Sequence, residues 1–241
     1  MPGRGTTPLY GNAWSTYRRG VRHNKALRRN FAQPRNSRGV SYLLGGSTKY
    51  TINETFYSLK GEGIHTGKPM FFIRFAGCNL VCDFCDTLHQ TGTTMTLEEL
   101  LGLVRNSPAN HVVLTGGEPT LYDYDKLCEG IIESGKALHI ETNGTNPLTF
   151  PFDWIACSPK SPIPTLSPSV IQTANELKFL VGMDGWQQYI DDVLHEFDPQ
   201  GLLYVMPLSV GGHEGIRGPE DIVQDNVQLA IQYCLEHPEF A

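Results

Sequence analysis

Three cysteines within eight residues form the stretch of the sequence best suited to chemistry. Cys78, Cys82 and Cys85 follow a C-x3-C-x2-C spacing directly behind the apolar run from Met70 to Phe75. Cysteine is scarce and is usually buried singly as a small apolar side chain, so this cluster favours metal binding over packing. Thiolates are soft ligands that suit zinc or an iron-sulfur cluster. The spacing therefore predicts a metal centre in this loop.

The number of ligands distinguishes the two kinds of metal centre. A structural zinc ion normally has four protein ligands, and the only nearby candidate for a fourth is His89, four residues after Cys85. An iron-sulfur cube held by three cysteines would instead leave one iron open to a small molecule. We therefore expect a cluster rather than zinc, and three buried cysteines without a metal are the least favoured alternative.

The whole chain has the size and composition of a folded domain with an appendage. Its 241 residues are 40% hydrophobic, which suffices for a sizeable core, and no apolar run reaches transmembrane length. The other three cysteines, Cys128, Cys157 and Cys234, are scattered singly, which is not the pattern of a disulfide framework. Oxygen-sensitive ligation also favours a reducing compartment. We expect a soluble, cytoplasmic protein without a membrane contact.

The first 48 residues differ sharply in charge from the rest. Residues 1–50 hold ten Lys or Arg and no Asp or Glu, whereas the other 191 hold 9 basic and 25 acidic residues, so +10 is followed by −16. We predict that residues 1–48 are a basic, disordered extension and that residues 49–241 form the core domain. The extension could be an organelle transit segment, an arm that contacts nucleic acid phosphates, or a dispensable addition.

Short apolar strands alternate with helices from residue 49 onwards. A capping box, Thr96-Leu-Glu-Glu99, opens one helix that extends to residue 104, and a glycine-punctuated loop occupies 58–63. We expect strands at 50–56, 70–75, 111–114, 137–140, 153–156, 176–180 and 202–205, and further helices at 124–134, 186–197 and 219–234. This alternation predicts a parallel α/β sheet, with too few strands for an eight-unit barrel and with polar clusters at the strand ends where ligands bind.

The cysteine spacing, with Phe84 before the last cysteine, resembles that of the radical S-adenosylmethionine (SAM) superfamily. In that superfamily three thiolates hold a [4Fe-4S] cluster, SAM chelates the fourth iron, and an electron from the cluster cleaves SAM to a 5′-deoxyadenosyl radical. The resemblance implies catalytic roles for Cys78, Cys82 and Cys85 as cluster ligands. It also implies an α/β fold, namely an incomplete (β/α)6-type barrel that is open on one side.

Further motifs at strand ends match the parts of that superfamily that contact SAM. Thr115-Gly-Gly-Glu118-Pro119 stands where the glycine-rich motif is expected; its glycines let a ligand approach the backbone, and Glu118 can meet a cation. Glu141-Thr-Asn-Gly144 and Ser158-Pro-Lys160 follow later strands, although each alone would be an ordinary turn. The residues that the resemblance assigns to SAM are Phe84, Cys85, Asp86, Gly117, Glu118, Thr142, Asn143, Ser158, Pro159 and Lys160.

A second group of motifs is more diagnostic and resembles the 7-carboxy-7-deazaguanine synthase family over about residues 52–208. Beside the motifs above, the likeness rests on Ser58-Leu-Lys-Gly-Glu62-Gly63, Arg74-Phe-Ala-Gly-Cys78-Asn-Leu80, Cys85-Asp-Thr87 and Leu177-Lys-Phe179. Members of that family contract 6-carboxy-5,6,7,8-tetrahydropterin to 7-carboxy-7-deazaguanine with loss of ammonia, on the route to queuosine-type guanines. The resemblance therefore implies a carbon-nitrogen lyase.

The same resemblance assigns residues to the substrate and to magnesium. The implied substrate contacts are Leu59, Lys60, Gly61, Glu62, Arg74 and Thr115. Arg74 would face the substrate carboxylate through its two-pronged guanidinium, and Thr87 matches the family's magnesium-binding threonine. Lys60 departs from the family, which more often has Gln there, so a contact through this side chain would differ in charge and in donors.

The implied cofactors are a [4Fe-4S] cluster, SAM and Mg2+. The implied partners are the pterin substrate, an electron donor such as flavodoxin or ferredoxin, and a second copy in a homodimer. Nucleic acid would be contacted only through the basic arm. Two alternatives remain open: a small radical SAM activase that acts on a partner protein, and a non-enzymatic zinc or iron-sulfur binding module.

The end of the sequence departs from the family pattern. Relatives usually continue into a further strand whose end closes over the substrate, whereas this sequence stops at Ala241 after its last predicted helix. His213, in a glycine-rich loop, could partly replace that closure, although a solvated loop histidine is the simpler expectation. The departure leaves the affinity for the substrate open.

Overall fold

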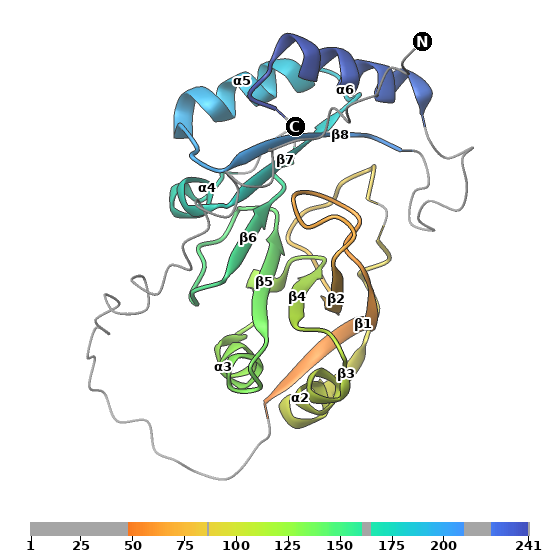
Figure 1. Ribbon diagram of the computed structural model, residues 1–241, viewed down its shortest axis with the longest axis vertical. Coiled ribbons are helices and arrows are strands. Elements are labelled where there is room, and N and C mark those ends of the chain that lie inside the picture. The colour runs from red at the N-terminus through yellow and green to blue at the C-terminus, as the bar shows by residue number, and fades with distance from the viewer. Residues whose placement is uncertain (1–47, 86, 161–164, 210–222, 241) are drawn as a thin grey trace, which may run out of the picture. The chain divides into compact units, whose positions relative to one another are not determined.

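One sheet of eight strands runs through the part of the chain that the computed structural model describes, residues 48–85, 87–160, 165–209 and 223–240 (Figure 1). The strands are β1 Lys49–Leu59, β2 Pro69–Phe75, β3 Thr93–Thr96, β4 His111–Gly116, β5 Ala137–Thr142, β6 Trp154–Cys157, β7 Glu176–Val181 and β8 Leu202–Pro207. Residues 1–47 lie outside the described residues. The predicted extension at 1–48 therefore stays a prediction.

The sheet combines a parallel core with an antiparallel edge. Its order is β3-β1-β2-β4-β5-β6-β7-β8. The six strands β2, β4, β5, β6, β7 and β8 run parallel, and β1 pairs antiparallel with both β2 and β3. Among the described residues β3 and β8 are edges and do not pair with each other, so the sheet does not close. The predicted open α/β barrel with six parallel strands is confirmed, and its strands end at one common edge.

Five helices and a short 3-10 turn accompany the described strands: α2 Leu97–Asn106, α3 Asp125–Glu133, α4 Pro168–Thr173, α5 Trp186–Phe197, α6 Gln224–Glu236 and η2 Pro119–Leu121. The predicted capping box at the start of α2 is confirmed. The backbone N–H of Glu99 donates to the Thr96 hydroxyl at 3.3 Å, and the Glu99 carboxylate accepts the Thr96 N–H at 2.7 Å. Such a cap contributes about 1 kcal/mol to the helix.

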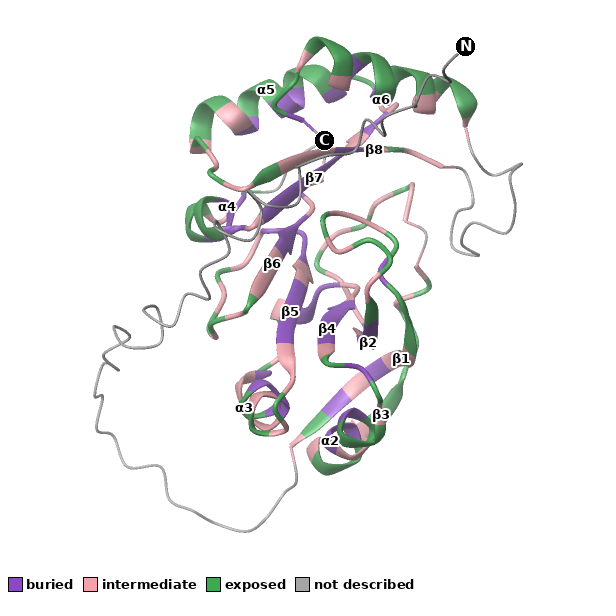
Figure 2. Cartoon of the chain, in the orientation of Figure 1, coloured by how far each residue is buried: buried purple, intermediate pink, exposed green. Residues whose placement is uncertain are grey.

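Alternation along the strands places apolar side chains on the face that the helices cover. Leu138 and Ile140 of β5 belong to one core cluster with Leu127 and Ile131 of α3, and a second cluster joins β7 to α4, α5 and α6. Figure 2 shows this as buried strand residues facing helices whose outer sides are exposed. Each fully buried Leu or Ile contributes about 1.5–3 kcal/mol, so the helices hold the strands firmly in register.

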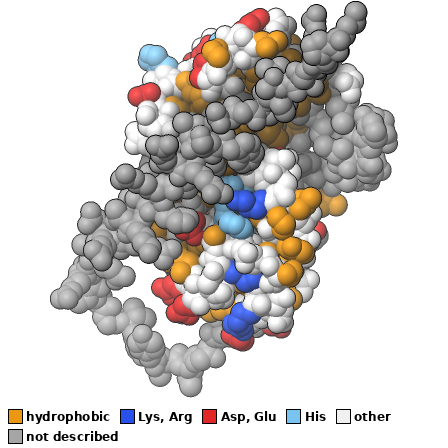
Figure 3. Space-filling model, in the orientation of Figure 1, with side chains coloured by type: hydrophobic (Ala, Val, Ile, Leu, Met, Phe, Trp, Pro, Cys, Tyr) orange, Lys and Arg blue, Asp and Glu red, His pale blue; other side chains and the backbone are white. Residues whose placement is uncertain are grey.

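The opposite face of the sheet carries polar side chains between smaller apolar contacts. The His111 Nδ1 and His139 Nε2 atoms lie 2.9 Å apart, and the ring centroid of His65 lies 5.1 Å from that of His139 and 4.6 Å from that of Trp154. Burial, together with Lys68 and the neighbouring imidazoles, lowers the pKa of His65 to about 4 and that of His139 to about 3. These two imidazoles are therefore neutral at pH 7. Figure 3 shows histidine side chains beside a cationic side chain on one face of the molecule.

Several predicted boundaries were wrong. β1 extends through Ser58 and Leu59, which the sequence had indicated as loop, and neither β3 nor α4 was predicted. The last helix begins at Gln224 rather than 219; residues 219–222 lie outside the described part, as does His213. Among the described residues, no helix has the length and apolar character needed to cross a bilayer.

Candidate active site

The cysteine loop between β2 and β3 is closed near its base by a backbone bond and tied to β1 by one side chain. The Gly77 N–H donates to the His89 carbonyl at 2.6 Å, near the start of the loop. The side-chain amide of Asn53 in β1 donates to the carbonyls of Leu88 and Thr91, at 2.7 and 2.9 Å. These bonds hold the two ends of the loop together beside β1. The three predicted ligands are free, partly exposed thiols: Cys78, Cys82 and Cys85.

The glycine pair of the Thr115–Pro119 motif packs against this loop. A Cβ atom on Gly117 would lie 1.8 Å from the Gly77 carbonyl oxygen, and one on Gly116, at φ +127°, would lie 2.2 Å from the Phe75 oxygen. The close approach is bonded, because Gly117 N–H donates to Phe75 O at 3.0 Å and Glu118 N–H to Gly77 O at 2.9 Å. The two glycines thus let this turn lie directly against the end of β2 and the start of the cysteine loop, and the predicted contact of Gly117 with SAM stays a prediction.

Glu118 joins the glycine motif to the end of β5. Its side chain is fully buried and accepts hydrogen bonds from the Thr120 hydroxyl (2.7 Å), the Thr142 hydroxyl (2.8 Å) and the Asn143 N–H (2.7 Å). The Asn143 amide in turn donates to the Asn79 side chain in the cysteine loop at 3.0 Å. Glu118 therefore organises the backbone around the thiols, while its predicted contact with the ammonium of SAM stays a prediction.

The donor set fits an iron-sulfur cluster. Burial raises the pKa of the Cys78 and Cys82 thiols, and at Cys82 the Lys160 ammonium opposes that rise. The Leu80 N–H already donates toward Cys78 Sγ at 3.4 Å, a contact that favours the thiolate. Within the described ranges, no three His, Cys, Asp or Glu side chains are grouped around the position of a single ion. Three cysteine thiolates are soft ligands of the kind that hold iron-sulfur clusters.

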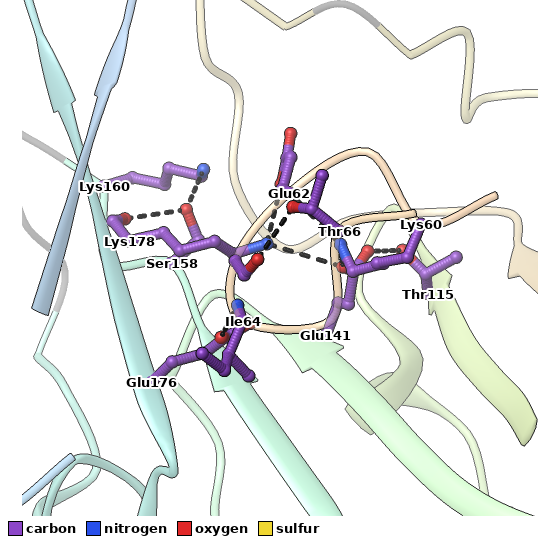
Figure 4. Close-up of polar contacts among 11 residues, drawn as sticks. Lys60, Glu62, Ile64, Thr66, Thr115, Glu141, Ser158, Lys160, Glu176 and Lys178 are labelled. Carbon is purple, nitrogen blue, oxygen red and sulfur yellow. Dashed lines mark hydrogen bonds and ion pairs between the residues drawn. The ribbon is translucent and has the colours of Figure 1, made fainter. Parts of the chain in front are cut away.

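A network of two lysines and two glutamates lies where β4, β5 and β7 face the loop after β1 (Figure 4). Lys60 Nζ lies 2.5 Å from Glu141 Oε1 and 3.9 Å from Glu62 Oε2. Lys178 Nζ lies 2.7 Å from Glu62 Oε2 and 3.4 Å from Glu141 Oε1, and the Thr115 hydroxyl donates to Glu141 Oε2 at 2.8 Å. The two ammonium groups and two carboxylates balance in charge.

The network keeps its members ionised. Although burial alone would raise the pKa of Glu141, the ammonium groups of Lys178 and Lys60 hold it well below its ordinary value. Burial would likewise raise the pKa of Glu62, but Lys178, and to a smaller extent Lys60, lower it. Burial would lower the pKa of Lys178, but Glu141 and Glu62 raise it. At neutral pH the site therefore presents fixed charges of both signs.

Comparison with known proteins places these motifs in a family. The sequence model of the Radical SAM superfamily matches residues 72–191. A 7-carboxy-7-deazaguanine synthase of Synechocystis sp. is 38% identical over 69% of this chain and 80% of its own length, and one of Burkholderia multivorans is 33% identical over 79% and 93%. The chain belongs to the 7-carboxy-7-deazaguanine synthase family.

Two further matches agree with this assignment. The 7-carboxy-7-deazaguanine synthase of Bacteroides thetaiotaomicron is 58% identical over 109 residues, which span 45% of this chain and 60% of that relative, less than two thirds of its length. The crystal structure of QueE from Escherichia coli is 27% identical, with a TM-score of 0.65, and the match covers 79% of this chain and 91% of that one. The superfamily implies the [4Fe-4S] cluster and SAM as cofactors.

Arg74, which the family resemblance places against the substrate carboxylate, lies at the carboxyl end of β2. Its Nε donates to Glu54 Oε1 at 2.8 Å, and the guanidinium carbon lies 5.7 Å from the centroid of the Phe56 ring. Its Nη1 donates to the Thr87 hydroxyl at 3.4 Å. The structure thus brings the predicted carboxylate-binding residue beside the predicted magnesium-binding threonine.

The Ser158–Lys160 segment contacts the same network from the end of β6. The Lys160 ammonium donates to the Ser158 hydroxyl at 2.8 Å, and that hydroxyl donates to the Lys178 carbonyl at 3.1 Å (Figure 4). The Ser158 N–H donates to the Thr142 carbonyl at 2.8 Å, which links this turn to the residues around Glu118. The predicted SAM-contacting motifs therefore form one connected edge of the sheet, and Pro159 is buried within it.

Not every predicted site residue joins this edge. Leu59 ends β1 with its side chain 61% exposed, and Gly61 is exposed as well. Phe84 lies half-buried on the cysteine loop, and Asp86 is outside the described residues. The ligand contacts of all these residues stay predictions.

Two charged residues of the site, Glu176 and Lys178, were not predicted as site residues. The sequence places Lys178 in a family motif and Glu176 at the start of a strand. Both are almost fully buried and alternate with the apolar Leu177 and Phe179 along β7. Charged residues at every second position of an otherwise apolar strand are a signal that could have found them, because such groups are almost never fully buried unless paired.

Proposed function

We propose that the protein is a radical SAM lyase that converts 6-carboxy-5,6,7,8-tetrahydropterin to 7-carboxy-7-deazaguanine with loss of ammonia, in queuosine-type biosynthesis. The observation that carries the proposal is the direct linkage of the three-cysteine loop, through Asn79, Asn143 and Glu118, to the strand ends that hold the charged network. A cluster ligand set and a polar site for a charged heterocycle thus share one edge of the sheet.

The cofactors have defined places in this proposal. Cys78, Cys82 and Cys85 would hold the [4Fe-4S] cluster, and the backbone near Gly117 and Asn143 would line the SAM site. When bound, the cluster and SAM supply the one-electron chemistry that removes hydrogen from the substrate. The chain's own task is to bind and orient the pterin and to exclude water from it.

The charged network suits the edge of a pterin ring. Glu62 and Glu141, which the two lysines keep ionised, are acceptors for the ring and exocyclic N–H groups of the substrate. Lys60 supplies a donor for its carbonyl oxygen, and the Thr115 hydroxyl, which donates to Glu141, presents its oxygen as a further acceptor. Because all four groups are fixed by one another before the substrate arrives, binding costs little reorganisation.

We place the substrate carboxylate against Arg74 and a magnesium ion against Thr87. The 3.4 Å contact between Arg74 Nη1 and the Thr87 hydroxyl supports this pairing, because a carboxylate that bridges both would lie beside each. Magnesium prefers oxygen ligands and retains several waters, so one threonine hydroxyl suffices from the protein. The ion would stabilise negative charge on the carboxylate during rearrangement.

We further propose a cytoplasmic homodimer that takes electrons from a flavodoxin or a ferredoxin. Six free cysteines support a reducing compartment. Analytical ultracentrifugation at the protein concentration used in the activity assay tests the dimer. Reduction of the reconstituted cluster by either donor protein tests the electron source. A monomer, or a cluster that neither donor reduces, would remove the respective part of the proposal.

The reaction is tested with anaerobically reconstituted full chain. SAM, Mg2+, a reductant and 6-carboxytetrahydropterin should yield 7-carboxy-7-deazaguanine, identified by mass, and Cys82→Ala should yield none. Leaving out Mg2+, or replacing Thr87 with Val, should lower turnover while iron content is unchanged. A fully loaded cluster that cleaves SAM but forms no deazaguanine would contradict the substrate assignment.

A further inference from the structure

The loop that carries Lys60 and Glu62 folds back onto strand β7, more than a hundred residues away in sequence. Backbone bonds close the loop on itself: Lys60 N–H donates to Lys68 O at 2.9 Å, and Gly67 N–H donates to Lys60 O at 2.8 Å. The Thr66 hydroxyl donates to the Gly63 carbonyl at 2.7 Å. The loop is therefore a compact unit whose orientation depends on what it touches outside itself.

Glu176, the first residue of β7, provides one such contact. Its side chain is almost fully buried, and its Oε2 accepts the N–H of Ile64 at 3.1 Å (Figure 4). A Cβ atom on Gly63, at φ +69°, would lie 2.4 Å from Glu176 Oε1 and 2.5 Å from Oε2. The carboxylate thus lies directly against the loop backbone, which only a glycine permits.

Two positions of β7 contact the loop together. Glu176 and Lys178 lie two residues apart on one face of the strand, so the first holds the Ile64 N–H and the second holds the Glu62 carboxylate at 2.7 Å. Lys60, on the same loop, is then directed to Glu141 of β5. A charged side chain is almost never fully buried unless it is paired, and the loop group that pairs with Glu176 is the backbone N–H of Ile64, so this contact bears directly on where the loop lies.

We propose that Glu176 is a positioning residue for substrate recognition. It fixes the loop through Ile64 and so sets Lys60 and Glu62 over Glu141, where the proposed function places the pterin. The inference rests on that function for its kinetic consequence only, because the loop contact itself can be measured without any substrate.

The first test is hydrogen exchange of the Ile64 amide in the reconstituted full chain. Glu176→Ala should accelerate exchange at Ile64 at least about tenfold, since a hydrogen bond to a charged group is lost. Gly63→Ala should produce the same change from the loop side and leaves β7 intact, which guards against misfolding of the first variant. Gly135→Ala is its control, because Gly135 has φ +79° with open space around it and lies after α3. Glu129→Ala, on the exposed face of α3, is the control for Glu176→Ala.

The second test separates positioning from a general loss of structure. Glu176→Ala should raise KM for the pterin about tenfold or more while leaving KM for SAM unchanged, and Glu176→Gln, which keeps an acceptor oxygen, should recover most of the loss. Unchanged Ile64 exchange in both Glu176→Ala and Gly63→Ala would overturn the inference. So would accelerated exchange with unaltered pterin KM in an active enzyme. If the wild type forms no deazaguanine, the exchange result still decides whether Glu176 holds the loop, and only the proposed function fails.

Discussion

Removing the Lys178 ammonium is the sharpest perturbation of the charged network. In Lys178→Met an unbranched apolar chain of similar length replaces a side chain that is only 5% exposed and whose Nζ lies 2.7 Å from Glu62 and 3.4 Å from Glu141. The variant leaves two carboxylates facing one cation, Lys60. The packing of β7 changes little, so the effect reports on charge.

The expected loss of unfolding free energy depends on how well the charges of Glu62 and Glu141 are still compensated without Lys178. Breaking a buried ion pair by deleting one partner costs about 3–5 kcal/mol. The Glu62 side chain is 44% exposed and can recruit water, and Lys60 still lies 2.5 Å from Glu141, so we expect the lower end, about 3 kcal/mol. Anaerobic urea unfolding of the metal-free chain at pH 7.5 measures it. The control is Lys126→Met on the exposed face of α3, which should stay within about 0.5 kcal/mol of wild type.

The pH dependence provides a second signature of the same perturbation. In the folded wild type the pKa values of Glu62 and Glu141 are lowered, so their contribution is present above the ordinary glutamate pKa and is lost as pH falls through the folded-state values. In Lys178→Met both pKa values move back up. The stability gap between the two proteins should therefore narrow as pH falls below about 4.5. A loss under about 1 kcal/mol at pH 7.5, or a gap that does not change with pH, would refute the reasoning.

Three further predictions concern other parts of the chain. Because His65 and His139 stay neutral when folded, with pKa values of about 4 and 3, but protonate near pH 6.5 when unfolded, the free energy of unfolding should fall by about 3 kcal/mol from pH 7.5 to 5.5. His139→Gln should remove about half of this fall in unfolding free energy. Urea titrations at both pH values that show the same fall as in wild type would contradict the prediction. Gly117→Ala would place a Cβ 1.8 Å from the Gly77 oxygen, so it should reduce incorporation well below about four iron atoms per chain. Gly102→Ala in α2 has open space around it and should load iron normally. Full iron loading of both variants would count against the packing argument. Arg74→Lys should raise KM for the pterin at least about tenfold, since a point charge replaces a planar donor pair, and an unchanged KM would remove Arg74 from the carboxylate site.

Elements with strong local signals could be predicted from the sequence. The capping box at Thr96 and the helix Trp186–Phe197 are where their patterns indicated, because capping and apolar periodicity act within a few residues. The four-residue strand β3 carries no such signal and exists through its pairing with Lys49–Ile52. The six-residue helix α4 is too short for a periodic pattern to be read.

The site shows the same division between local and long-range information. Motif residues such as Lys60, Thr115 and Glu118 could be placed at strand ends, but their partners could not. Glu176 meets Gly63 only because β7 and the loop after β1 pack together across the sheet. Likewise, the glycine pair Gly116-Gly117 looks like a ligand-binding turn in sequence, and only the fold reveals that the backbone of Phe75 and Gly77 also packs directly against it.

The account depends on one iron of the cluster having no protein ligand. His89 is the candidate for such a protein ligand, because its Nδ1 is buried without a hydrogen-bond partner among the described residues. The direct measurement is electron-nuclear hyperfine spectroscopy of the reduced, reconstituted chain with SAM labelled with 15N at its amino group and 13C at its carboxylate. We predict couplings from both labels, unchanged in His89→Ala. A protein nitrogen coupling that disappears in His89→Ala, with no coupling from labelled SAM, would contradict the account.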